Sequence, residues 1–117
     1  MSLHLTNEML AHCYDYMTVT RPFIEWNLPA SEDIHFQVIR DPRYFGWYDI
    51  IGGKDTISIS RSRVGQTATL FPQMAHEMAH MVLRRNGLVI DPTVHNAAFW
   101  KLARTICREH GWDHLNF

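Results

Sequence analysis

The five residues His76-Glu77-Met78-Ala79-His80 constrain this 117-residue chain more than any other stretch. Residues four apart lie on one face of an α-helix, so a helix here directs both imidazoles to the same side. Two such imidazoles can hold one metal ion, and the glutamate carboxylate between them then lies beside that ion. The pattern predicts two metal ligands, His76 and His80, and one acid–base group, Glu77. The alternative is a helix whose histidines are ordinary surface or core residues.

The sequence around this motif predicts where its helix begins and ends. Thr67 or Thr69 can cap the N-terminus, and Pro72 is tolerated in a first turn, where its missing N–H has no partner to lose. We expect the helix to end near Asn86, because Gly87 can adopt the left-handed conformation that closes a helix.

A third ligand is needed, because a catalytic zinc ion takes three protein ligands and keeps one position for water. The extended pattern His-Glu-x-x-His-x-x-Gly-x-x-His is excluded, since Leu83 and Asn86 stand at its glycine and histidine positions. We favour His95, which lies one short linker beyond the motif helix, where antiparallel packing of two helices can bring it to the metal. The other downstream candidates are Glu109, His110 and His114.

Hydrophobic periodicity elsewhere predicts one α+β domain over residues 1–117. Three strands are expected to form an antiparallel meander that packs against an N-terminal helix and two long helices that carry the site. A stretch with two prolines, residues 21–33, is expected to be an ordered loop with at most one helical turn. The remaining elements are a helix from a Thr6 cap to about Met17, strands at Ile34–Arg40, Tyr44–Ile51 and Thr56–Ser60, and a helix from Asp91 or Thr93 to about His110, stopped by Gly111.

Composition and charge narrow the possible functions. A net charge of -1 and a pI near 6.7 give no electrostatic signature of a nucleic-acid or anionic-membrane partner. No apolar run is long enough to span a bilayer, and the N-terminal residues lack a signal-peptide pattern, so a cytoplasmic protein is expected. Cys13 and Cys107 form no Cys-x-x-Cys pair, which excludes a zinc ribbon and predicts free thiols in a reducing compartment.

Three segments of the second half of the chain resemble the SprT-like and WLM-type zinc metallopeptidases, which are small gluzincin-like domains. They are Ile57–Ser60, His76–His80 and His95–Trp100, and they occur in the family's order. The resemblance implies one Zn²⁺ ion on the two motif histidines and His95, Glu77 as catalytic base, and a zincin-like core. The family's C-terminal zinc ribbon and DNA-binding extension are not found, so DNA-linked proteolysis is not expected. A bacterial or phage origin is plausible for so small a domain.

The leading hypothesis is therefore hydrolysis of a protein or peptide by a zinc-activated water, with Glu77 as the base. The strand Thr56–Ser60, if it lies at an exposed sheet edge, could hold the substrate backbone. A helper for the oxyanion is not identified, and the candidates are Arg104, His110 and His114. Two alternatives stay open. One is a zinc-containing binding or adaptor protein without turnover, marked by a fourth ligand from His110 or His114. The other is a protease that cleaves one regulatory protein.

Overall fold

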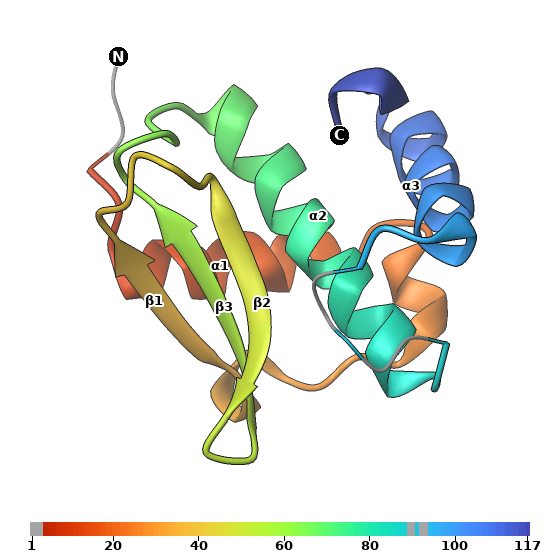
Figure 1. Cartoon of the computed structure of the whole chain (residues 1–117), viewed down its shortest axis with the longest axis horizontal. Helices are drawn as coiled ribbons and strands as arrows, with labels where there is room; N and C mark the ends of the chain where they lie inside the picture. The colour runs from red at the N-terminus through yellow and green to blue at the C-terminus, as the bar shows by residue number, and fades with distance from the viewer. Residues whose placement is uncertain (1–3, 89–90, 92–93) are drawn as a thin grey trace.

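A three-stranded sheet and three α-helices make up the described part of the fold (Figure 1). The computed structural model describes residues 4–88, 91 and 94–117. The elements are α1 (Asn7–Thr18), β1 (His35–Ile39), β2 (Gly46–Ile51), β3 (Lys54–Ser60), α2 (Thr67–Arg85) and α3 (Ala97–His110), with short 3-10 helices η1 (Phe23–Trp26), η2 (Ser31–Asp33) and η3 (His114–Asn116). The predicted α+β class is confirmed, whereas the loop expected to hold at most one helical turn contains both η1 and η2.

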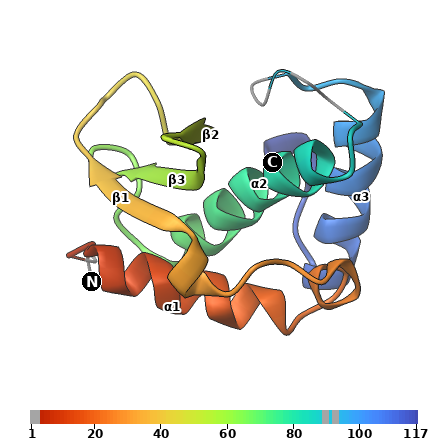
Figure 2. The same ribbon diagram turned by 90° about the horizontal axis from the view of Figure 1, so that it is seen from below.

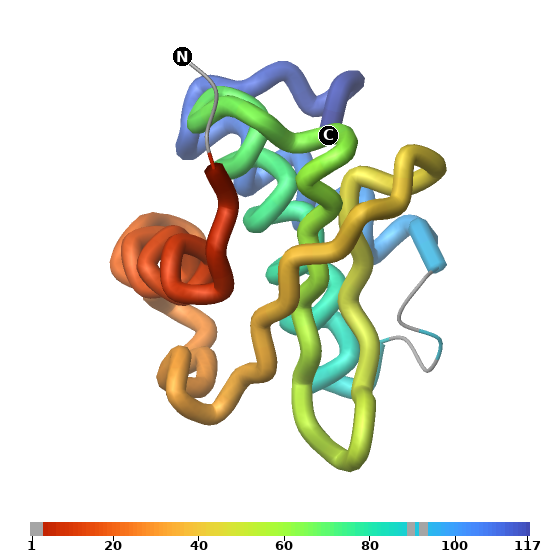
Figure 3. Tube along the Cα trace, turned by 90° about the vertical axis from the view of Figure 1, so that its left-hand side faces the viewer, coloured from red at the N-terminus to blue at the C-terminus, as the bar shows by residue number. Residues whose placement is uncertain are grey.

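The sheet is mixed, with strand order β1-β3-β2, so the predicted antiparallel meander is wrong. The turn at Gly52 and Gly53, both with positive φ, joins β2 to β3 as an antiparallel hairpin. Residues 40–45 then place β1 on the other side of β3, to which it runs parallel (Figure 3). Alternating hydrophobicity identifies strands but not their partners, which is why the predicted strand order was wrong. Consequently β3 is central and β2 is an edge strand.

The helices cover the sheet and form the core with it. Figure 2 shows α1 packed below the sheet and α2 running between the sheet and α3. Thr6 caps α1, as predicted, by accepting a hydrogen bond from the Met9 N–H at 3.2 Å. Fully buried side chains from the sheet and from all three α-helices meet in the core, among them Tyr14, Met17, Ile57, Ile59, Met74, Met78 and Ile106.

The motif helix α2 begins at Thr67, close to the predicted start, but neither predicted threonine caps it. Its N-cap is Gln66, whose side chain makes no capping hydrogen bond, so the predicted caps at Thr67 and Thr69 are wrong. Pro72 consequently lies inside the helix rather than in its first turn. The predicted C-terminus is confirmed, since Asn86 is the C-cap and Gly87 follows with φ +69°.

The third helix begins later than predicted. Asn96 caps α3 by accepting a hydrogen bond from the Phe99 N–H at 3.0 Å, so Asp91 does not start the helix. Thr93, the other predicted start, lies outside the described residues. Gly111 ends α3 in the left-handed conformation, as predicted. A helix long and apolar enough to cross a membrane is absent from the described part of the chain.

Candidate metal centre

Three imidazoles from two parts of the chain form one cluster. His76 and His80 lie one turn apart on α2, and His95 lies just before the cap of α3. One ring nitrogen from each histidine can be chosen so that the three nitrogens lie within 4.8 Å of one another. The Nε2 atoms of His80 and His95 are 3.1 Å apart. Tetrahedral zinc with Zn–N bonds of about 2.0–2.1 Å requires roughly 3.3 Å between ligand nitrogens. The three histidines are therefore close enough together to hold a metal ion.

The orientation of the His76 ring is fixed from outside the cluster. Its Nδ1 lies 2.9 Å from the main-chain oxygen of Phe117, so the Nδ1–H donates to that oxygen and leaves Nε2 for a ligand. The ring of Phe99 is fully buried and packs against all three imidazoles, with centroids 5.0, 4.6 and 4.4 Å from those of His76, His80 and His95. Such outer contacts hold metal ligands in place before the metal binds.

Burial keeps the two motif histidines neutral. Burial, together with the neighbouring imidazoles, lowers the pKa of His76 to about 4 and that of His80 to about 3. Within the described structure, His80 Nδ1 is buried without a hydrogen-bond partner. The other ring nitrogen, Nε2, contacts His95 Nε2 inside the cluster. Neutral imidazole is the form that binds a metal ion, so these residues suit a divalent transition metal at neutral pH.

Glu77 lies in a confined polar position beside the cluster. It is 2% exposed, and its Oε2 accepts a hydrogen bond from Gln73 Nε2 at 2.5 Å. The β2 main chain is close on the other side, because a Cβ atom at Gly46 would lie 3.5 Å from the same oxygen. Burial raises the pKa of Glu77 to about 8, although the Gln73 bond acts in the opposite direction. A divalent cation on the adjacent imidazoles would favour the ionised carboxylate.

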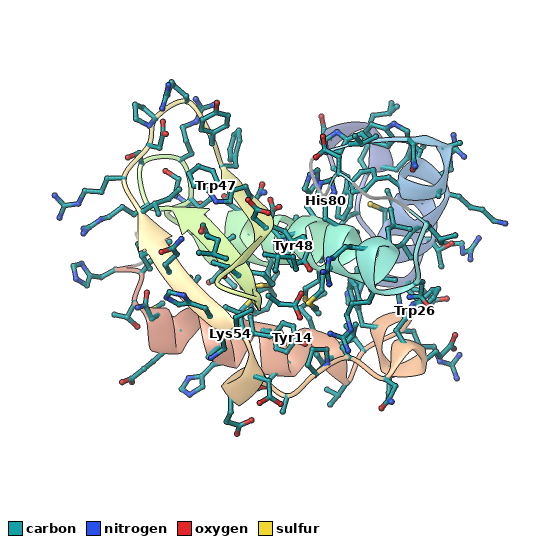
Figure 4. All side chains as sticks on the ribbon, turned by 60° about the horizontal axis from the view of Figure 1, so that its bottom comes forward. Tyr14, Trp26, Trp47, Tyr48, Lys54 and His80 are labelled. Atoms are coloured by element: carbon teal, nitrogen blue, oxygen red, sulfur yellow. The ribbon has the colours of Figure 1, made fainter. Side chains whose placement is uncertain are left out.

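These residues face a cavity of about 720 Å³. Figure 4 shows His80 on α2 between the sheet, which carries Trp47 and Tyr48, and α3. The β2 strand and the loop before it form one wall, α2 contributes Gln73, His76, Glu77 and His80, and His95 and Phe117 complete the lining. A cavity with aromatic walls and a few converging polar groups is typical of a binding site for a small molecule or a peptide. We name it the metal cleft.

The remaining candidates from the sequence lie outside the cluster. His110 stacks on Trp112 at 4.6 Å between ring centroids and contacts Thr20 Oγ1 at 3.2 Å, which ties the end of α3 to the segment after α1. Glu109, His114 and Arg104 are exposed, and among the described residues none of them joins the three imidazoles.

Two residues of the site were missed by reasoning from the sequence. Gln73 lies four residues before Glu77, and this spacing on a helix was a usable signal. Phe117 gave no signal, because it acts through a main-chain oxygen and reaches His76 only through the path of the last segment.

Comparisons of the chain with protein-family models, with curated proteins and with solved structures found no significant match.

Proposed function

We propose that this protein is a zinc-dependent peptidase that hydrolyses a peptide bond with Glu77 as the general base. The observation that carries the proposal is a buried carboxylate beside three clustered imidazoles at the wall of the metal cleft. Three imidazoles and a glutamate in the His-Glu-x-x-His spacing are the residue types that a metalloprotease uses as ligands and base. Two segments, His76–His80 and His95–Trp100, resemble segments of SprT-like peptidases. We also interpret the α+β fold as zincin-like. Both points support the same function.

The protein's own residues divide the chemistry between them. His76, His80 and His95 would hold the ion, which supplies a Lewis acid and a water molecule of lowered pKa. Gln73 holds Oε2 of Glu77, which leaves Oε1 to take the proton from the attacking water. The same carboxyl group then gives that proton to the departing amine nitrogen, so the base returns to its starting state.

The substrate main chain is best accommodated along β2. The strand predicted for this role, Thr56–Ser60, is unsuitable because β3 has partners on both sides. The outer edge of β2 is not paired with any strand of the described structure, and β2 lines the metal cleft. At its first residue, Gly46, the strand comes close to Glu77. An extended peptide added to this edge would pass beside the general base.

The alternative of a zinc-containing adaptor requires a closed ligand sphere. His110 and His114 were the candidates for a fourth ligand, and neither belongs to the cluster found among the described residues. A three-ligand set leaves room for water, which favours turnover over a purely structural ion.

The substitution Glu77→Gln tests this function. The zinc content of wild type and variant would be measured after purification, together with cleavage of a degenerate peptide library and of unfolded proteins. We expect equal zinc and a fall in cleavage of about 10²–10⁴-fold, the usual contribution of a general base. Glu109→Gln, at an exposed position on α3, is the control and should cleave normally. Unchanged cleavage by Glu77→Gln would remove Glu77 as the base, and zinc without any cleavage by wild type would favour the adaptor.

A further inference from the structure

A second cavity, of about 520 Å³, adjoins the metal cleft. Phe45, Gln73 and Phe117 line both cavities, so the two cavities are neighbours. We name the second cavity the tail pocket, because its other walls come from the first turns of α2 and from the segment after α3. They are Ala68, Thr69, Pro72, Gly111, Trp112, Asp113 and Asn116.

Three aromatic residues, Phe45, Trp112 and Phe117, line the tail pocket, and their rings contact other parts of the protein. Arg63 covers one face of Phe45, with its guanidinium carbon 4.5 Å from the ring centroid, while 42% of Phe45 remains exposed. Trp112 is stacked on His110, and the Phe117 ring lies 5.2 Å from that of His76. The pocket is therefore formed before a ligand arrives, which lowers the entropic cost of binding.

The charges around the tail pocket select an ionic ligand of neither sign. Asp113 is the one charged residue among the described lining residues. Its carboxylate is already used, since it accepts hydrogen bonds from the Leu115 N–H at 3.0 Å and from Asn116 Nδ2 at 3.4 Å. The positive end of the α2 dipole and the Arg63 guanidinium also disfavour a cation. Asp113 opposes an anion, and the α2 dipole and Arg63 offset this effect, so the surroundings select an ion of neither sign.

We propose that the tail pocket binds an aromatic side chain of the substrate, at the residue next to the cleaved bond. This inference rests on the proposed peptidase function. A peptide paired with β2 passes Gly46, beside Glu77, and the residue that precedes Gly46 in the chain, Phe45, is a wall of the tail pocket. An aromatic ring fits the walls because faces and edges of Phe45, Trp112 and Phe117 can pack around it.

The test uses two peptide hydroxamates that share one backbone and differ in a single side chain, benzyl or methyl. A hydroxamate binds a protein-held zinc ion whether or not the protein turns over, so the measurement is independent of catalysis. Dissociation constants would be measured by calorimetry on the zinc-loaded protein. We expect the benzyl compound to bind about tenfold more tightly, as burial of most of an aromatic ring predicts.

A matched pair of variants tests whether the tail pocket causes the preference for the benzyl compound. Ala68→Phe places a ring in the tail pocket and should reduce the benzyl preference to about twofold or less. Thr67→Phe adds the same ring in the same turn of α2, but Thr67 lines a separate depression beside α1, so the preference should stay. Neither residue belongs to the metal cleft.

The outcomes separate this inference from the proposed function. A benzyl preference that Ala68→Phe removes, in a protein that cleaves nothing, supports the pocket and contradicts the peptidase function. Cleavage of peptides without a benzyl preference supports the peptidase and overturns the pocket. A preference that survives in Ala68→Phe, or no binding of either hydroxamate to zinc-loaded protein, also overturns it.

Discussion

The side-chain amide of Gln73 donates a hydrogen bond to Glu77 Oε2 over 2.5 Å, across one turn of α2. Glu77 is almost completely buried, and burial raises its pKa. The hydrogen bond from the neutral amide of Gln73 lowers the pKa of Glu77 and so favours its carboxylate form. The two side chains are thus linked, and we assign Gln73 as a positioning residue for Glu77, the proposed general base.

The first prediction concerns that bond. Gln73→Leu removes the donor and shortens the side chain by one heavy atom, and we expect kcat to fall about 10–100-fold, in line with a hydrogen bond to a charged group. KM and zinc content should stay near wild type, because neither depends on the orientation of Glu77. Gln66→Leu is the control, since Gln66 makes no capping bond with its side chain on the same helix. A rise in KM with kcat unchanged would assign Gln73 to substrate binding instead.

The second prediction concerns the third ligand. His95→Ala should reduce zinc affinity more than about 100-fold, beyond the 10–100-fold typical of a residue that only supports a ligand. Stability of the metal-free protein should change little, because the His95 side chain is exposed. The measurement is metal content by mass spectrometry with titration of a competing chelator. His110→Ala, a change outside the cluster on α3, should retain zinc; full zinc retention by His95→Ala would exclude His95 from the site.

The third prediction concerns the buried carboxyl group without metal. The pKa of Glu77 rises from 4.5 in the unfolded chain to about 8 in the folded protein. The folded state therefore holds a proton that the unfolded state releases, and stability is lost as the pH rises from about 4.5 through 8. Glu77→Gln removes this loss. In urea unfolding of the metal-free proteins, the variant should gain roughly 2–3 kcal/mol relative to wild type between pH 5 and pH 8. An equal difference at both pH values would show that the pKa of Glu77 is not raised.

The fourth prediction concerns the approach of β2 to α2. A Cβ atom at Gly46 would lie 2.4 Å from the main-chain oxygen of Ser58 and 3.5 Å from Glu77 Oε2, so Gly46→Ala must push β2 outward. We expect a loss of about 1–3 kcal/mol in the free energy of unfolding, the usual cost of overpacking, together with reduced cleavage. Gly65→Ala is the control, because nothing lies within 4 Å of its added Cβ and its backbone does not have positive φ. Equal stability of the two variants would contradict the close packing at Gly46.

Local sequence was sufficient to predict much of the helical part of the site. The helix that carries His76, Glu77 and His80 and the position of its C-terminus were read correctly from spacing and from Gly87. His95 was expected in or just before the first turn of the next helix, and it lies just before the N-cap of α3. These features depend on hydrogen bonds and side-chain periodicity within a few residues, which is the range over which a sequence pattern carries information.

Other features depended on contacts between distant segments. The sequence alone determined that strands, a metal-ligand helix and a later histidine exist, because each is encoded by neighbouring residues. The tertiary structure alone decided that β2 rather than β3 is the edge strand, that Phe117 orients His76, and that burial shifts the pKa values of Glu77 and the motif histidines. Strand order, desolvation and long-range hydrogen bonds arise only when segments far apart in the chain pack together, so the generic metal-binding motif of the sequence became a defined cleft only in the folded protein.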